Sequence, residues 1–145
     1  MQPASMLKAP EASTSFAQRA IATLHSFRFF GPAFILPGVV SPDLPASFAV
    51  FAAYGDLATG LLAMLALLTA RIRTLFWSFV VAFNVVGAID LGLAYYHAIQ
   101  ADLPAHAGEF GAMYAIPIIY VPALAITHAA AFYLLLRRRR AAPPL

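Results

Sequence analysis

The chain has 145 residues, of which 62% are hydrophobic and 10% are charged, and its formal net charge is +3. Soluble domains carry about 25% charged residues, so this composition is typical of a small membrane protein with one compact domain. Because cysteine is absent, disulfides, thiol catalysis, iron–sulfur clusters and covalent c-type haem are excluded, and any metal would need histidines and carboxylates.

The basic residues predict the topology of the chain. Four apolar stretches follow one another, and every Lys and Arg lies near the start of the first stretch, between the second and third, or after the fourth: Lys8, Arg19, Arg28, Arg71, Arg73, Arg137, Arg138, Arg139 and Arg140. Short cytoplasmic loops are rich in Lys and Arg, so we expect four transmembrane helices with both termini in the cytoplasm. The arginine run after the fourth stretch would then contact anionic lipid headgroups, and no nucleic-acid partner is predicted.

The predicted elements in chain order are a disordered cytoplasmic tail, four helices and a short second tail, at about residues 1–15, 20–40, 46–70, 75–99, 109–136 and 141–145. Residues 16–140 would form an all-α, four-helix membrane domain, because each helix has the ~20 residues that a ~30 Å hydrocarbon core requires. Proline and glycine interrupt the first helix at residues 31–32, and Pro117 and Pro122 predict kinks in the fourth. A signal peptide cleaved near residues 44–47 is an alternative that would leave three helices.

The second helix carries small residues on one face, at Ala49, Ala53, Gly60 and Ala63. Small residues let helix backbones approach closely in lipid, where no hydrophobic drive holds helices together. This pattern predicts a tight bundle, although it could also reflect no more than the abundance of alanine in the chain.

Two acids, Asp56 and Asp90, fall inside predicted helices at membrane depth. Asp56 lies fifteen residues before Arg71 at the cytoplasmic turn, and Asp90 lies seventeen residues after the end of that turn. A rise of about 1.5 Å per residue therefore places both acids roughly 22–26 Å above the turn. The two helices would form an antiparallel hairpin, so the acids can meet in the outer half of the membrane. Two carboxylates within ~4–6 Å do not both ionise readily, and one is expected to hold a proton near neutral pH.

Three further polar residues are predicted near the two acids. Tyr120 lies near the same level, and Asn84 shares one side of its helix with Asp90, so we expect both to orient the acids. Arg28 starts about 6 Å deeper, and its long side chain can either pair with an acid or extend to the cytoplasmic surface. With the acids, these residues would form a ligand or proton site, a structural lock between helices, or a contact with a partner subunit.

His25 and His128 fall at comparable depths in the cytoplasmic half of the first and fourth helices. Two histidines on facing helices could ligate a b-type haem, although no other motif supports one. The alternative is that each histidine hydrogen-bonds a neighbouring helix. His97 and His106 belong to the outer interface and loop, where we expect solvated side chains, and no metal site is predicted. Lys8 is the only lysine, which excludes a retinal Schiff base.

Three groups of residues carry a resemblance to a known family: Tyr54-Gly55-Asp56-Leu57 with Gly60-Leu61-Leu62-Ala63, then Phe83-Asn84-x-x-Gly87-x-x-Asp90-Leu91, then Ile116-Pro117, Val121-Pro122 and His128. With these motifs, residues 26–136 resemble a family of small polytopic integral membrane proteins of bacteria that has no assigned activity. The resemblance implies a multi-pass protein of the bacterial inner (cytoplasmic) membrane, and it implies no particular activity. The residues selected by depth also lie inside the motifs of that family.

The sequence therefore predicts a non-enzymatic membrane protein with a polar site between its helices. Asp56 and Asp90 would bind a small polar ligand or share a proton, and Arg28 would supply the countercharge. One alternative is a proton-linked carrier of small solutes, which would need to be a homo-oligomer because four helices leave little room for a path. Another is an accessory subunit of a larger membrane complex. A membrane enzyme with one of the acids as general acid is a further alternative, although no nucleophile or cofactor motif accompanies it.

Overall fold

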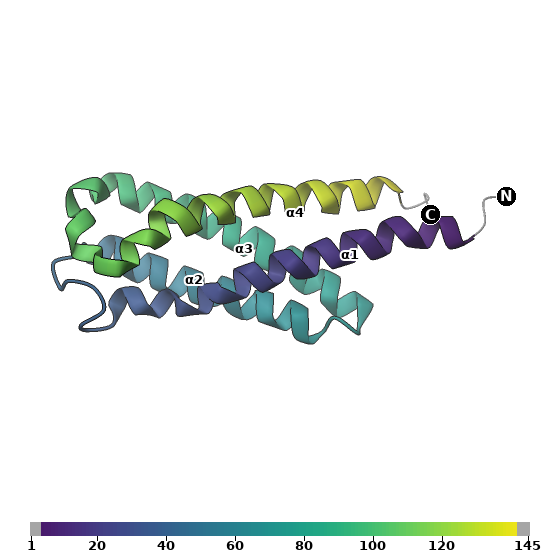
Figure 1. Ribbon diagram of the computed structural model, residues 1–145, viewed down its shortest axis with the longest axis horizontal. Coiled ribbons are helices and arrows are strands. Elements are labelled where there is room, and N and C mark those ends of the chain that lie inside the picture. The colour runs from purple at the N-terminus through teal and green to yellow at the C-terminus, as the bar shows by residue number, and fades with distance from the viewer. Residues whose placement is uncertain (1–3, 142–145) are drawn as a thin grey trace.

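The structure is a computed structural model that describes residues 4–141, and over these residues it contains helices and a single isolated bridge between Pro37 and Val40. The elements in chain order are α1 (Ala4–Ser26), η1 (Phe27–Ile35), α2 (Ala46–Leu68), α3 (Arg73–Gln100), η2 (Leu103–Tyr114), η3 (Ile116–Tyr120) and α4 (Val121–Ala141). η1 and η2 are 3₁₀-helices and η3 is a π-helix. Figure 1 shows one elongated bundle with both ends of the described chain at the same end. The predicted all-α class is confirmed.

Three of the helices are long and apolar enough to cross a membrane, namely Ala46–Leu68, Arg73–Gln100 and Ile116–Arg140. They correspond to the second, third and fourth predicted spans. The first predicted span is not among them, because α1 carries Lys8, Glu11 and Arg19 and ends at Ser26 before a helix of another type begins. The structure thus supports a helical membrane protein, and three of the four predicted spans meet the requirements of length and hydropathy.

The first segment differs from its prediction at both ends. Residues 4–15, which were predicted as a disordered tail, belong to α1. The helix predicted over residues 20–40 ends early, since α1 passes into η1 at Phe27 and η1 stops at Ile35. Pro32 explains the change, because it has no N–H to donate to the carbonyl four residues before it. Of the predicted tail at 141–145, residues 142–145 lie outside the described residues.

The fourth predicted helix, at residues 109–136, is divided into three pieces. η2 ends at Tyr114 and contains a break at Gly111, whose φ of 54° favours glycine. Pro117 lies in the first turn of η3, and Pro122 is the second residue of α4. Both prolines therefore begin a helix, where a missing N–H costs little, and the predicted kinks take the form of helix boundaries.

Two buried apolar clusters lie along the bundle. The first core joins α1, α2 and α3 beside the α2–α3 turn, through Ala22, Ala63, Ala66, Phe76, Trp77, Val80 and Phe83. The second core joins η1, α2 and η2 at the opposite end, through Phe34, Leu44, Phe48, Ala49, Ala52, Leu103 and Phe110. The predicted small face of α2 lies against η1: a Cβ on Gly60 would overlap the backbone of Phe29. Between the two cores lies a layer of buried polar side chains.

Candidate functional site

An ion cluster of Arg28, Asp56 and Asp90 occupies this polar layer and joins three elements. Arg28 of η1 donates from Nε to Asp56 Oδ1 of α2 at 2.5 Å, and from Nη2 to Asp90 Oδ2 of α3. The side chain of Arg28 is 1% exposed, whereas those of Asp56 and Asp90 are 17% and 11% exposed. The structure therefore brings together the two acids that depth arithmetic paired, and Arg28 lies behind them instead of extending to the surface.

Arg28 is held in turn by a second layer of residues. Its Nη1 lies 3.5 Å from the carbonyl oxygen of Gly87 and 3.5 Å from His128 Nε2. His128 Nδ1 lies 2.9 Å from Asn84 Oδ1, and Asn84 Nδ2 donates to the carbonyl oxygen of Val80 at 2.8 Å. Because Asn84 turns its oxygen to His128, the ring must donate from Nδ1 and accept from Arg28 at Nε2. Asn84 thus orients His128 and, through it, Arg28, and its hydrogen bonds do not reach the acids themselves.

Glycines allow the helices to approach closely at this level. A Cβ on Gly55 would overlap the carboxylate of Asp90. A Cβ on Gly87 would lie 2.6 Å from His128 Nε2 and 2.7 Å from Thr59 Cγ2. Both contacts are shorter than van der Waals distance, so any larger residue would push α2, α3 and α4 apart. Gly55 and Gly87 therefore let the helices approach closely enough for the ion cluster to form.

Tyr120 does not join the cluster, contrary to the prediction that it orients the acids. Its hydroxyl donates to the carbonyl oxygen of Leu24 at 2.6 Å, close to the junction of α1 and η1. Carbonyl groups at the end of an α-helix lack partners within the helix, and Tyr120 supplies one. Tyr120 is the last residue of the π-helix η3, and its hydroxyl points to α1 instead of the acids.

The two predicted haem histidines contact each other, with ring centroids 4.1 Å apart. His25 Nε2 lies 2.9 Å from Thr127 Oγ1, so each histidine pairs with a side chain of another helix, as the alternative interpretation expected. A haem ligated by two histidines requires the porphyrin plane between their rings. Rings already in contact leave no space for that plane, so His25 and His128 do not fit a haem site. Among the described residues no group of three or more His, Asp and Glu could hold a metal ion.

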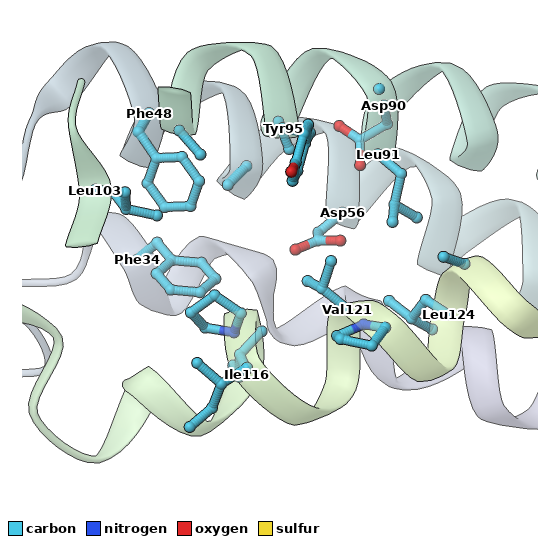
Figure 2. Close-up of a pocket in the computed structure, with 18 of the residues that line it drawn as sticks. Phe34, Phe48, Asp56, Asp90, Leu91, Tyr95, Leu103, Ile116, Val121 and Leu124 are labelled. Carbon is cyan, nitrogen blue, oxygen red and sulfur yellow. The ribbon is translucent and has the colours of Figure 1, made fainter. Parts of the chain in front are cut away.

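A cavity of about 860 Å³ opens beside the ion cluster, between α3 on one side and η3 and α4 on the other. Figure 2 shows Asp56 between Phe34 and Phe48 on one side and Leu124 on the other, with Asp90 above it in the view. Apart from the ion cluster, the lining side chains are almost all apolar or aromatic: Phe34, Phe48, Ala52, Leu91, Tyr95, Ala98, Ile99, Leu103, Tyr114, Ile116, Ile118, Val121 and Leu124. The sequence did not reveal this cavity, because its walls include the non-α segments η2 and η3.

A family profile for a domain of unknown function, DUF8737, matches residues 5–136. The chain belongs to this family. No curated protein and no solved structure matches the chain. The region that matches DUF8737 contains the whole ion cluster, its second layer and every residue that lines the cavity. Since the family description assigns no activity, the function of this DUF8737 protein has to be argued from the geometry of that site.

The ion cluster of the DUF8737 protein has two chemical capacities. It fastens η1, α2 and α3 to one another, which a structural lock would also do. Its acids, however, remain partly exposed beside a cavity, and no hydrogen bond from a described residue reaches Asp56 Oδ2. A carboxylate oxygen that borders an apolar space can accept a hydrogen bond from a bound molecule or hold a proton. The ion cluster thus joins three helical elements and also presents its acids to the cavity.

Proposed function

We propose that this protein is a multi-pass, non-enzymatic protein of the bacterial inner membrane that binds a small amphipathic molecule in the cavity. The apolar part of the molecule contacts the walls, and its polar head contacts Asp56 and Asp90. The observation that carries this proposal is a largely apolar space of about 860 Å³ whose lining includes two partly exposed acids. Small-molecule pockets measure about 300–1,000 Å³ and combine apolar walls with a few converging polar groups.

The apolar walls refine the ligand expected from the sequence. A small, wholly polar solute would leave most of the lining without favourable contacts, whereas an amphipathic molecule matches both parts of the site. Tyr95, Ile99 and Ile118 line the cavity and are more than half exposed, so the space is reached from the lipid-facing side of the bundle. A molecule that already partitions into the membrane could therefore enter from the bilayer.

The proposal includes a topology of four spans with both termini in the cytoplasm, in which α1 and η1 together form the first span. Its support is the position of the basic residues other than Arg28, which lie toward the end of the bundle that carries the termini and the α2–α3 turn. There, the guanidinium carbon of Arg138 lies 3.8 Å from the centroid of the Trp77 ring. Such a pair suits the interface, and Arg137, Arg139 and Arg140 would contact anionic headgroups nearby.

A cavity-filling variant tests the proposed binding. Ala98 lines the cavity and is half-buried, so Ala98→Phe places a ring in the space. Ala130 is an exposed residue of α4 outside the lining, and Ala130→Phe is the matched control. Each protein is taken gently from its native membrane into lipid nanodiscs and examined by native mass spectrometry. We expect a bound small molecule on the wild type and on Ala130→Phe, and none on Ala98→Phe. Absence of bound mass on the wild type, or its persistence on Ala98→Phe, contradicts the proposal.

One observation favours a proton-linked carrier as a second candidate. A row of buried polar side chains leads from the ion cluster toward the terminal end of the bundle, through His128, His25 and Gln18. Among the described residues, His25 Nδ1 and Gln18 Oε1 are buried without a hydrogen-bond partner, and water molecules would satisfy them. Proteoliposomes that contain a pH-sensitive dye test this candidate: ligand movement should change the internal pH with the wild type and not with Asp56→Asn. Equal pH changes with both proteins would reject it.

A further inference from the structure

The geometry points to the charge of the ligand: we infer that the cavity selects a monocation, and specifically an organic amine with an apolar body. This inference rests on the proposed function and names the class of molecule that the site would take. Four features of the site support it, namely the sum of its charges, the commitment of Arg28, the acids along the lining, and the aromatic walls.

The charges of the ion cluster do not balance. One guanidinium faces two carboxylates, so the cluster carries one negative charge when both acids are ionised. An uncompensated charge next to an apolar space is costly, since the low dielectric strengthens its interaction with any opposite charge and penalises its isolation. A ligand that brings one positive charge would neutralise the cluster, whereas an anionic ligand would leave it with two negative charges.

Arg28 is not available to an anion. All three of its guanidinium nitrogens already have partners, because Nε and Nη2 donate to the acids and Nη1 faces Gly87 and His128. Its side chain is 1% exposed and lies behind the two carboxylates. A carboxylate or phosphate in the cavity would therefore meet oxygens of Asp56 and Asp90 before it met the guanidinium. The site differs in this respect from arginine pockets that present their donors to an anion.

The rest of the lining adds negative charge and aromatic surface. Asp102 lines the cavity, and among its lining residues Arg28 is the one base beside three acids. A cleft lined by one sign of charge raises the local concentration of oppositely charged ligands. Phe34, Phe48 and Tyr95 also border the space, and aromatic faces attract ammonium groups. An alkyl or aryl amine combines the cation that the acids require with an apolar body for these walls.

A series of three probes with one tail tests the inference. Decylamine, decanol and decanoic acid are offered to the protein in nanodiscs of phosphatidylcholine, a lipid without net charge. Native mass spectrometry reports occupancy, which is referred to the concentration of each probe in the lipid phase. Decylamine should bind at least about tenfold tighter than decanol, because its ammonium group is attracted by the net negative charge of the ion cluster and the uncharged hydroxyl of decanol is not. Decanoic acid should bind most weakly.

Asp56→Asn gives the deciding variant. The remaining pair of Arg28 and Asp90 is neutral, and the Asn oxygen can still accept from Arg28 Nε, so the fold is retained while the excess charge is lost. We expect decylamine and decanol to bind this variant within about twofold of each other. Asp90→Asn serves as a second variant with the same expectation. Asp43→Asn, at an exposed acid outside the cavity, should keep the full preference for decylamine.

Equal binding of decylamine and decanol to the wild type would overturn the inference, since the acids would then be neutralised by a shared proton. Preference for decanoic acid, or binding of none of the three probes, would overturn it as well. These outcomes are separate from the test of the proposed function, which uses the molecule bound in the native membrane and the Ala98→Phe variant.

Discussion

Around the first core, regular α-helices close on one another and leave side chains such as Ala63, Val80 and Phe83 with no exposure. The second core instead combines α2 with the 3₁₀-helices η1 and η2, and it borders a cavity of about 860 Å³. The ion cluster lies where these two halves meet. Regular helices with small residues on their facing sides can pack without gaps. Proline and glycine in η1, η2 and η3 prevent that regular packing, so the half that contains them keeps a space for a ligand.

This difference assigns separate tasks to the two halves. The first core contributes stability through its close packing, and it takes no part in the proposed binding. In the proposed function the second half supplies binding, and it would do so only while the ion cluster fastens it to the first. Substitutions in the ion cluster, in either core or at a single contact should therefore differ in how much unfolding free energy they remove. They should also differ in whether they weaken ligand binding.

The largest effect is expected from Arg28→Ala, which separates the two halves. It leaves two partly buried carboxylates without their cation, and breaking a buried ion pair costs about 3–5 kcal/mol. The measurement is the free energy of unfolding in mixed detergent micelles. Arg71→Ala, at an exposed residue of the α2–α3 turn, should change it little. A loss below about 1 kcal/mol for Arg28→Ala would show that the acids carry no unbalanced charge in the folded protein.

Truncation of one phenylalanine in each half measures the difference in packing directly. Phe83 has no exposure in the first core, and Phe83→Ala should cost about 3–5 kcal/mol of unfolding free energy because the site cannot collapse. Phe34 is also buried but borders the cavity, so Phe34→Ala enlarges a space that already exists and should cost less. Conversely, ligand occupancy should fall with Phe34→Ala and not with Phe83→Ala. Equal costs for the two variants would mean that the second half is packed as tightly as the first.

A pair of glycines on neighbouring helices tests the close approach beside the acids. Gly55→Ala introduces a Cβ that overlaps the carboxylate of Asp90, and we expect a loss of about 1–3 kcal/mol together with weaker ligand binding. A Cβ on Gly92, in the interior of α3, meets nothing within 4 Å. Gly92→Ala should therefore stabilise the helix by about 0.5–1 kcal/mol, because alanine loses less backbone freedom on folding than glycine. Thermal unfolding of both variants decides the matter, and a stable Gly55→Ala protein would refute the close approach.

The parts of this site that the sequence could predict are those fixed by helix rise. Asp56 and Asp90 lie on the two regular helices α2 and α3, so counting residues from their shared turn placed them at one level, where the structure joins them through Arg28. For Tyr120, helix rise predicted a level but no direction around the helix axis, whereas Asn84 was predicted on the same side of α3 as Asp90. In the structure Tyr120 faces α1, and Asn84 faces His128.

What could not be predicted depends on segments without a regular rise. The bounds of the first and fourth helices were wrong because Pro32 and Pro117 change the helix type, and each change shifts every later residue. His128 was predicted either as a haem ligand or as a hydrogen-bond partner of a neighbouring helix, and its contact with Arg28 was not predicted. Asn84 and His128 both belong to the motifs quoted above, and this was the sequence signal that could have linked His128 to the site. The cavity arises from these same irregular segments.

The smallest effect is expected from Tyr120→Phe, which removes one hydrogen bond to the carbonyl of Leu24 and keeps the ring. A buried hydrogen bond contributes about 0.5–1.5 kcal/mol, so the unfolding free energy should fall by that amount. Because the Tyr120 hydroxyl donates to Leu24 and not to a member of the ion cluster, the preference for decylamine over decanol should stay unchanged. Tyr133→Phe, at a residue that is 63% exposed, is the control for the loss of a hydroxyl. A changed ligand preference in Tyr120→Phe would place Tyr120 in the binding site after all, and would mean that the junction of α1 and η1 shapes the cavity as well as closing the helix end.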